Sequence, residues 1–270
     1  MFHHFHDDKV HKKGQGSISQ DDFYNLINFI GKSNILNADI FYEKFKDGKL
    51  KPKEVCLTFD DSIKCQIDIA LPVLEDLNIK SFFFTYTSLF EKKPDNLEVF
   101  RYFRMNYFED INEFYNNFYI FLSKDLSHFF KDNEEIIKNK KKKFPYYSIE
   151  DLKFRLVRDT LIDKSEYEKV MFNMMKEKKF KPEKFYSSLF FNEKDLINLD
   201  KLGHQVGLHS HNHPILMEKL SYKKQKTEYE KCKSIISRIL KKSQSEIKFM
   251  SHPCGSYSQE TLKILRELNI

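Results

Sequence analysis

The stretch that decides the fold is Val55-Cys56-Leu57-Thr58-Phe59-Asp60-Asp61, in which an apolar run ends in two adjacent carboxylates. Short apolar runs of this kind are typical of strands that are buried on both faces in a parallel sheet. In parallel α/β folds, ligands bind at the carboxyl ends of the strands. The stretch therefore predicts a buried strand over residues 55–59 that delivers Asp60 and Asp61 to a binding site.

A second stretch, Leu208-His209-Ser210-His211-Asn212-His213-Pro214, places His209 and His213 four residues apart. One carboxylate and two imidazoles form a ligand set suited to Zn²⁺ or a similar divalent metal. Three protein ligands leave a coordination position open, which is typical of catalytic rather than structural metal sites. The remaining carboxylate is then free to act as a base. Together the two stretches predict metal-assisted hydrolysis.

The rest of the N- and C-terminal parts alternates between strand and helix patterns, which predicts an α/β fold with parallel pairing. After the opening strand, in which His3 and His4 should point to opposite sides, comes a loop containing Gly14-Gln15-Gly16. A helix that Ser19 caps and Gly31 closes should follow. Further helices are expected over 41–50 and over 62–77, where Pro72 should introduce a kink, and strands are expected over 79–86, 205–208 and 247–250.

Residues 91–186 differ in pattern, because Phe and Tyr recur at helical spacing and strand signals are almost absent. We interpret this region as a helical insertion between two parts of one domain, 1–90 and 187–270. Its aromatic stripe indicates a core more than a sugar-binding surface. The basic stretch Lys138–Lys143 is expected to be a solvated linker between helices.

Composition narrows the possible functions. The net charge of +6 is modest, and no motif that reads nucleic-acid bases is present, so no nucleic-acid partner is expected. The four cysteines are scattered, which predicts reduced thiols and a cytoplasmic location. No apolar run is long enough to cross a membrane, and no secretion signal is recognised. The sequence gives no indication of the oligomeric state.

The motifs resemble those of the polysaccharide deacetylases of the NodB-homology type, which remove N- or O-acetyl groups from sugars. That family carries T-F-D-D, found here as Thr58–Asp61, and H-[ST]-x-x-H-P, found here as His209–Pro214. Its third motif is present in altered form at Ser251–Tyr257, and the opening Met1–His4 is similar to the first strand of many members. Over 1–90 and 187–270 the resemblance implies a (β/α) barrel that acts on an acetylated sugar or glycan precursor.

The resemblance also implies roles for individual residues. Asp61, His209 and His213 correspond to the metal ligands of the family, and Asp60 corresponds to its general base. The ion would be Zn²⁺ first, with Co²⁺, Ni²⁺, Fe²⁺ or Mn²⁺ as alternatives. The backbone N–H of Cys254, after the proline of the third motif, corresponds to the donor that stabilises the oxyanion.

The chain departs from the family pattern at two positions. Ser251 stands where the family often has an arginine that contacts the catalytic aspartate. The family's late L-x-H motif, which supplies the general acid, is not found before Ile270, so we expect a barrel without its last strands. His3 and His252 are the candidates to replace that acid, because each is predicted at the rim end of a strand.

The motif residues also have simpler interpretations. Asp60 and Asp61 precede a predicted helix and could serve as its N-cap, and the histidines could form a chance surface cluster. His211 is expected to point away from the metal, and His204 is expected at the surface. Two other functions remain open: a metal- and glycan-binding member without turnover, and a hydrolase of a different amide. A phosphoesterase is disfavoured, because such sites usually hold more ligands for two or more metals.

Overall fold

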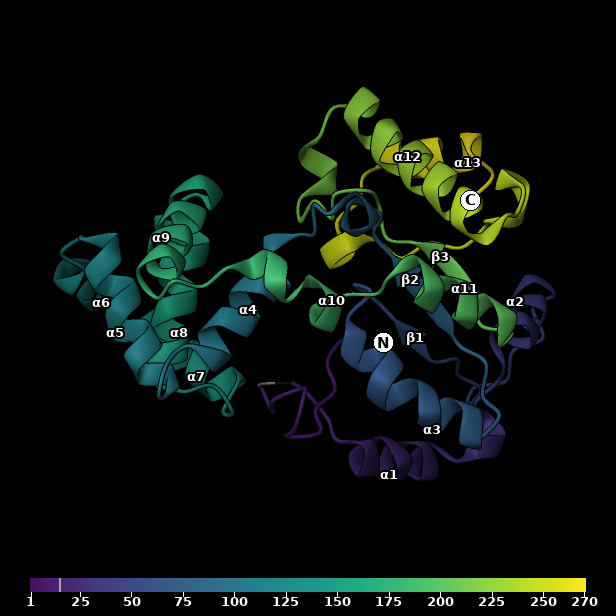
Figure 1. Cartoon of the computed structure of the whole chain (residues 1–270), viewed down its shortest axis with the longest axis horizontal. Helices are drawn as coiled ribbons and strands as arrows, with labels where there is room; N and C mark the ends of the chain where they lie inside the picture. Colours follow the sequence, from purple (N-terminus) through teal and green to yellow (C-terminus); the bar gives the residue numbers. More distant parts are fainter. Residues whose placement is uncertain (15) are drawn as a thin grey trace. The chain divides into compact units, whose positions relative to one another are not determined.

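The computed structural model describes residues 1–14 and 16–270, and it divides into two compact units (Figure 1). The first unit comprises residues 1–95 and 185–270, and the second comprises residues 96–184. Each unit is described by itself. Of the loop expected around Gly14-Gln15-Gly16, Gln15 lies outside the described residues.

A small parallel sheet forms the centre of the first unit. It consists of β1 (Thr58–Phe59), β2 (Phe82–Thr85) and β3 (Gln205–Leu208) in the order β1-β2-β3, with both pairings parallel. Isolated parallel bridges extend it on both sides, from Phe2 to Phe59 and from Leu208 to Met250. The predicted α/β fold with parallel pairing is therefore confirmed, and the carboxyl ends of five chain segments lie along one edge.

Four of the five expected strands, including the opening one, are shorter than the sequence suggested, whereas β3 has the expected bounds. β1 begins only at Thr58, because Val55 forms a bridge with Ile35 instead of continuing the sheet. Cys56, expected in a buried strand, is half-buried and outside it. β2 covers only the centre of 79–86, and within 247–250 only Met250 forms a bridge.

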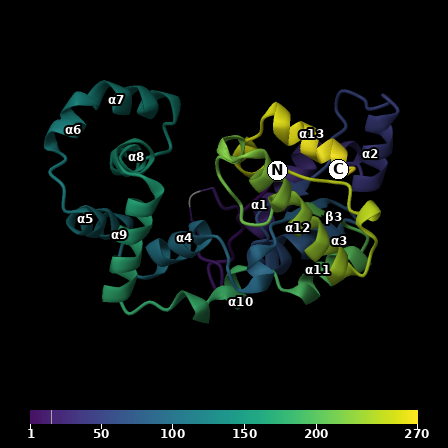
Figure 2. The ribbon, with the colours of Figure 1, turned by 90° about the horizontal axis from the view of Figure 1, so that it is seen from above.

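The helices of the first unit surround this sheet. They are α1 (Gln20–Ile30), α2 (Ala38–Lys46), α3 (Leu71–Asp76), α10 (Tyr186–Leu189), α11 (Glu193–Lys201), α12 (Tyr222–Leu240) and α13 (Gln259–Glu267). The helices α12 and α13 lie side by side in both views (Figure 1, Figure 2). As expected, Ser19 caps α1 by accepting a hydrogen bond from the Asp22 N–H, and Gly31 ends it with a left-handed φ of 85°.

Two predicted helices of this unit have wrong bounds. The helix expected over 41–50 is α2, which begins at Ala38, directly after Asn37, and ends at Lys46. The helix expected over 62–77 is divided into a π-helical turn, Gln66–Ala70, and α3. Pro72 lies in the first turn of α3, so its missing N–H is tolerated there, and the change of helix type precedes it.

The two faces of β2 pack into different clusters. Phe83 stacks on Phe59 at 4.6 Å between ring centroids, within the main core that α3, α11 and α12 also enter. Phe82 and Phe84 point the other way and pack beside Phe249. Gly207 allows this packing, because a Cβ at that position would lie 2.7 Å from the Phe84 ring and from the Phe249 carbonyl oxygen.

The second unit is helical throughout residues 96–184. It contains α4 (Asn96–Asn106), α5 (Ile111–Leu122), α6 (Ser127–Asp132), α7 (Glu134–Lys143), α8 (Ile149–Leu156) and α9 (Lys164–Glu177). Its aromatic rings form the interior, with Phe103, Phe114, Phe118 and Phe154 fully buried. The linker expected over Lys138–Lys143 is wrong, because these residues form the last turns of α7, where lysines interact favourably with the negative end of the helix dipole.

The sequence predicted reduced cysteines, and it contains no apolar run long enough to cross a membrane. The four cysteines, Cys56, Cys65, Cys232 and Cys254, are all free. Among the described residues, every helix is too short or too polar to cross a bilayer.

His204 is buried, with 1 % of its surface exposed, so its expected surface position is wrong. It precedes β3, and its Nδ1 accepts a hydrogen bond of 3.0 Å from the Ser81 N–H. Its Nε2 lies 3.3 Å from Glu75 Oε1. Burial lowers the pKa of His204 to about 4, although the Glu75 carboxylate acts in the opposite direction.

This burial predicts a loss of stability in acid. Because the pKa of His204 in the folded chain lies below the ordinary value of 6.5, the unfolded chain binds more protons between those two values. The free energy of unfolding should fall as pH decreases from about 6.5 to about 4, by on the order of 2–3 kcal/mol. Urea unfolding at pH 7.5 and pH 4.5 measures this, and the difference should shrink in His204→Gln but not in the exposed control His128→Gln. Equal pH dependence in both variants would contradict the assignment.

Candidate metal centre and active site

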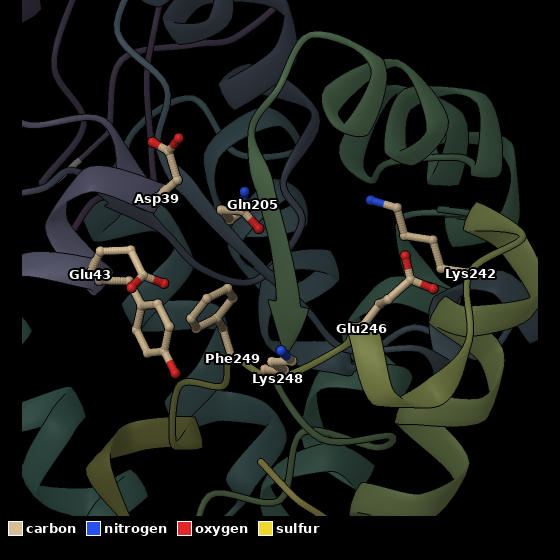
Figure 3. A pocket seen from close by; sticks show the side chains of 8 residues that line it. Asp39, Glu43, Gln205, Lys242, Glu246, Lys248 and Phe249 are labelled. Carbon is tan, nitrogen blue, oxygen red and sulfur yellow. The ribbon is translucent and has the colours of Figure 1, made fainter. Parts of the chain in front are cut away.

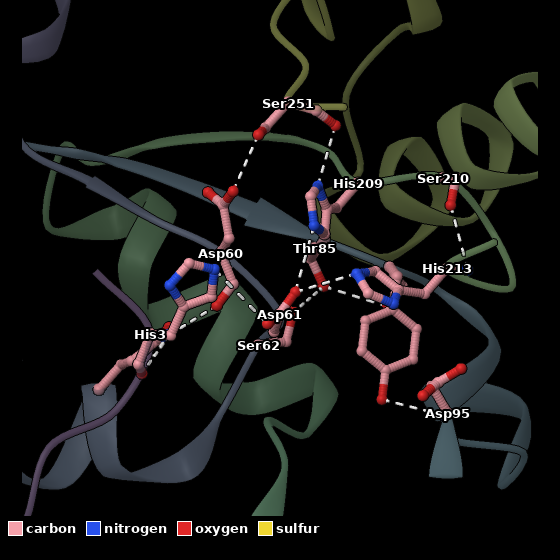
Figure 4. Close-up of polar contacts among 12 residues, drawn as sticks. His3, Asp60, Asp61, Ser62, Thr85, Asp95, His209, Ser210, His213 and Ser251 are labelled. Atoms are coloured by element: carbon pink, nitrogen blue, oxygen red, sulfur yellow. Dashed lines mark hydrogen bonds and ion pairs between the residues drawn. The ribbon is translucent and has the colours of Figure 1, made fainter. Parts of the chain in front are cut away.

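The polar residues of the site follow directly after the parallel segments of the first unit. Each comes one position after a paired residue, so the shared direction of the segments brings them to one edge. These residues are His3 after Phe2, Asp60 after Phe59, His209 after Leu208, and Ser251 after Met250. Figure 4 shows His3 and His209 directed toward Asp61, and Ser251 linked to Asp60 and to His209.

Asp61, His209 and His213 form the candidate metal centre. Asp61 Oδ1 lies 3.1 Å from His209 Nε2 and 3.2 Å from His213 Nε2. One ligand atom from each of the three residues lies within 4.8 Å of the others. Both histidines are buried, and the carboxylate is partly exposed. The set combines one oxygen and two nitrogen ligands on one side of a shared space, which fits a divalent ion with an open position.

The hydrogen bonding of His209 supports this fit. His209 Nδ1 lies 2.9 Å from the carbonyl oxygen of Ser251, which can only accept a hydrogen bond. Nδ1 therefore carries the proton, and in the neutral ring Nε2 presents its lone pair toward Asp61. This arrangement is the usual one for a histidine that binds a metal through Nε2.

The charges of the three residues are strongly linked. Burial by itself would raise the pKa of Asp61, but hydrogen bonds and charges of His209 and His213 outweigh it and hold this pKa well below its usual range. For His209, burial favours the neutral ring, but the Asp61 carboxylate raises its pKa above the ordinary value. Asp61 is therefore ionised at neutral pH and offers a negatively charged oxygen to a cation.

Asp60 lies beside this cluster in a different environment. It is buried, with 2 % of its surface exposed, and its Oδ2 accepts a hydrogen bond of 2.8 Å from Ser251 Oγ. Burial raises the pKa of Asp60, and His209 and the Ser251 hydrogen bond oppose the rise only in part. A carboxylate with a raised pKa accepts a proton more readily at neutral pH, which suits a general base.

The backbone around the site is strained. Asp61, Ser62, Ser210, His213 and Cys254 all have left-handed φ angles between 52° and 72°, although none is glycine. Such conformations cost free energy and persist only where the surroundings hold them. Here Ser62 Oγ donates to Thr85 Oγ1 at 2.5 Å, and the Ser210 hydroxyl accepts from the His213 N–H at 3.1 Å.

Of the two candidate acids, His3 lies nearer the carboxylates. His3 Nε2 is 3.7 Å from Asp61 Oδ2, and both Asp60 and Asp61 oppose the lowering of its pKa by burial. His4 does not point to the opposite side, because the two imidazole centroids are 6.3 Å apart and nearly parallel. The expected alternation fails because the segment is not a regular strand and pairs with β1 only at Phe2.

The third motif forms a short turn over Pro253–Gly255. The His252 ring stacks on exposed Tyr257 at 4.6 Å, and burial together with His209 lowers the pKa of His252. Cys254 is exposed overall, and partial desolvation of its thiol together with the Asp61 and Asp95 carboxylates raises the pKa of the thiol. Its backbone N–H forms no hydrogen bond with the described residues.

Two residues that the sequence did not single out support the site. Gln66 is fully buried, and its Nε2 donates to the carbonyl oxygens of His3 at 3.0 Å and Asp60 at 2.6 Å. It thereby joins the N-terminal segment to the end of β1. Glu228 on α12 accepts hydrogen bonds from the loop between the two histidine ligands. Neither residue belongs to a motif, so no local sequence signal marks them.

A separate hollow lies at the opposite edge of the sheet, where β3 begins (Figure 3). It contains mixed charges and two aromatic rings, and none of the candidate site residues lines it. Its lining residues are Asp39, Tyr42, Glu43, Gln205, Lys242, Glu246, Lys248 and Phe249. This hollow is therefore distinct from the candidate site at the carboxyl edge.

Comparison with known proteins agrees with the motifs. Residues 47–103 and 138–270, which make up more than half of the chain, match the sequence model of the polysaccharide deacetylase family. The match omits residues 104–137, which lie within the helical unit. No curated protein sequence matches the chain.

Solved structures of three deacetylases have a similar fold. Streptococcus pyogenes deacetylase PplD, in complex with acetate, shares 17% identity at a TM-score of 0.56 over 100% of this chain and 78% of its own. IcaB from Ammonifex degensii shares 11% sequence identity at a TM-score of 0.55, over 100% of this chain and 78% of its own. A de-N-acetylase from Aggregatibacter actinomycetemcomitans shares 12% sequence identity at a TM-score of 0.55, over 100% of this chain and 83% of its own. At these identities the likeness establishes the fold alone.

Proposed function

We propose that this chain, which belongs to the polysaccharide deacetylase family, is a metal-dependent hydrolase that removes an N-acetyl or O-acetyl group from a sugar or glycan precursor. The observation that carries the proposal is the convergence of Asp60 and the Asp61–His209–His213 set on one edge of the sheet. A carboxylate with a raised pKa next to three ligands with an open position is an arrangement that supports metal-assisted hydrolysis of an amide or ester.

The ligands and the base have separate roles in this proposal. Asp61, His209 and His213 would hold a divalent ion, with Zn²⁺ as the first candidate, and the ion when bound would polarise the acetyl carbonyl as a Lewis acid. Asp60 accepts the proton of the attacking water, and Ser251 Oγ orients the carboxylate for this transfer. The free N–H of Cys254 donates to the carbonyl oxygen as negative charge develops on it.

His3 is our choice for the acid that protonates the leaving amine. The parallel bridge at Phe2 brings it to the same edge as Asp60, and its Nε2 faces Asp61. Its side chain is 36% exposed, so a substrate can reach it. His252 is the weaker candidate, because one face of its ring is covered by Tyr257 and its Nδ1 is buried without a partner.

The ligand set predicts metal binding that depends on single residues. Asp61→Ala and His213→Ala should each abolish stoichiometric binding of Zn²⁺, because two remaining ligands hold the ion too weakly. Metal content after dialysis, measured by atomic emission, tests this against His128→Ala, an exposed histidine of the helical unit. Full metal content in either site variant would contradict the ligand assignment.

The base is predicted to be separable from metal binding. Asp60→Asn should keep the metal, because Asp60 is not a ligand, and should lose acetate release from the substrate by about 10²–10⁴-fold. Activity is measured as acetate released from a panel of N- and O-acetylated sugars, including nucleotide- and lipid-linked forms. Undiminished deacetylation by Asp60→Asn would overturn the mechanism. Metal binding by the wild-type chain without acetate release from any substrate would favour a binding protein instead.

The acid assignment predicts different effects for the two histidines. His3→Gln should lower kcat by about 10²–10⁴-fold on an N-acetyl substrate, because the amine leaves poorly without a proton. The loss should be smaller on an ester substrate, whose leaving alkoxide can be activated by a weaker donor. His252→Gln should retain most of the wild-type kcat. A larger loss in His252→Gln than in His3→Gln would reverse the assignment.

A further inference from the structure

Glu228 is a buried carboxylate whose partners are almost all in the loop between the two histidine ligands. It lies in the second turn of α12, with 9% of its surface exposed. Its Oε2 accepts hydrogen bonds from the backbone N–H groups of His211 at 3.0 Å and Asn212 at 2.7 Å. Its Oε1 accepts a third, from Asn212 Nδ2 at 2.7 Å.

No lysine or arginine of the described residues forms an ion pair with Glu228. A buried carboxylate without a cationic partner is costly unless its oxygens are satisfied by hydrogen bonds. Here the carboxylate oxygens of Glu228 accept from three N–H donors of the 209–213 loop, and these donors reach the carboxylate only in this loop conformation. The charge of Glu228 therefore stabilises that conformation specifically, and α12 gains little from it otherwise.

The opposite side of the same loop is fixed as well. The carbonyl oxygen of His211 accepts from the N–H groups of Thr87 at 3.2 Å and Ser88 at 2.9 Å. The imidazole Nδ1 of His211 lies 2.9 Å from Thr87 Oγ1, and its Nε2 lies 3.6 Å from Glu91 Oε2. The middle of the loop is thus held between α12 and the segment after β2, and the imidazole of His211 is directed away from the candidate metal centre.

These contacts on both sides of the 209–213 loop determine where His213, the second proposed histidine ligand, lies. His209 is fixed by the sheet, since its N–H donates to the Thr85 carbonyl oxygen at 2.8 Å. His213 has no such contact with a strand, and its φ of 54° is strained. Its position depends on the intervening residues, which Glu228 holds through two adjacent backbone groups.

We infer that Glu228 is a positioning residue that preorganises the 209–213 loop so that His213 completes the metal centre. The inference rests on the proposed function, because it presupposes that Asp61, His209 and His213 bind a divalent ion. Residues that orient metal ligands through hydrogen bonds typically affect metal affinity 10–100-fold when they are replaced. Glu228 would do so through the backbone instead of through a ligand side chain.

The test is Co²⁺ binding to the full chain, followed by the visible absorption of the bound ion and by competition with a chelator. Glu228→Gln keeps the volume of the side chain but turns an NH₂ group toward N–H donors, so the Co²⁺ dissociation constant should rise about 10–100-fold. Glu230→Gln, two residues away and exposed on the same helix, is the matched control and should leave affinity unchanged. Asn212→Ala removes only the Oε1 contact and should have a smaller effect.

The outcomes separate this inference from the proposed function. A purely structural role would lower the thermal midpoint of the metal-free chain in Glu228→Gln, yet leave the Co²⁺ affinity and spectrum of the folded variant at wild-type values. That result would overturn the inference and leave the metal centre intact. A wild-type chain that binds no Co²⁺ would overturn the metal centre, and the inference with it. Weaker binding with an altered spectrum in Glu228→Gln, together with wild-type binding in Glu230→Gln, would support both.

Discussion

The parallel alignment of five chain segments is the constraint on which the site depends. Phe2, β1, β2, β3 and Met250 pair in one direction, so the residues after them meet at one edge although they are far apart in sequence. An antiparallel arrangement would send alternate segments to opposite edges, and it would separate Asp60 and His209 from His3 and Ser251. The strand register also fixes how far along the strand direction His209 lies. Thr85 pairs with Leu208, and the N–H of the next residue, His209, donates to the Thr85 carbonyl oxygen.

Bringing these residues together has a physical cost. Two adjacent carboxylates, two buried imidazoles and five left-handed backbone positions are each unfavourable alone. The structure offsets this cost with polar contacts that have no other evident purpose, such as Gln66 on the carbonyl of Asp60 and Ser62 on Thr85. A fold under selection for stability alone would replace such a cluster with apolar side chains. Its presence therefore argues for function at this edge.

Part of this arrangement of site residues can be predicted from the local sequence, and part of it cannot. The positions of Asp60, Asp61 and His209 could be predicted, because each follows a short apolar run whose burial and direction are readable. The roles of Glu228 and Gln66 could not be predicted, because the partners of Glu228 lie 16 or more residues away and Gln66 joins Asp60 to His3, which lies 63 residues away along the chain. His204 has the polarity of a surface residue, and only the tertiary partner Ser81 explains its burial. The linker predicted over Lys138–Lys143 is a helix instead, because lysine has a high helix propensity despite the dense positive charge of this stretch.

Ser251 contacts both Asp60, the proposed base, and His209, a proposed metal ligand. Its hydroxyl donates to Asp60 Oδ2 while its carbonyl oxygen accepts from His209 Nδ1. A guanidinium at this position, as is common in the family, would lower the pKa of the carboxylate by its charge. A hydroxyl orients the carboxylate without that charge, so burial dominates and the pKa of Asp60 stays raised. Ser251 therefore holds the carboxylate of Asp60 in place without a cationic charge beside it, which is compatible with the proposed role of Asp60 as the base.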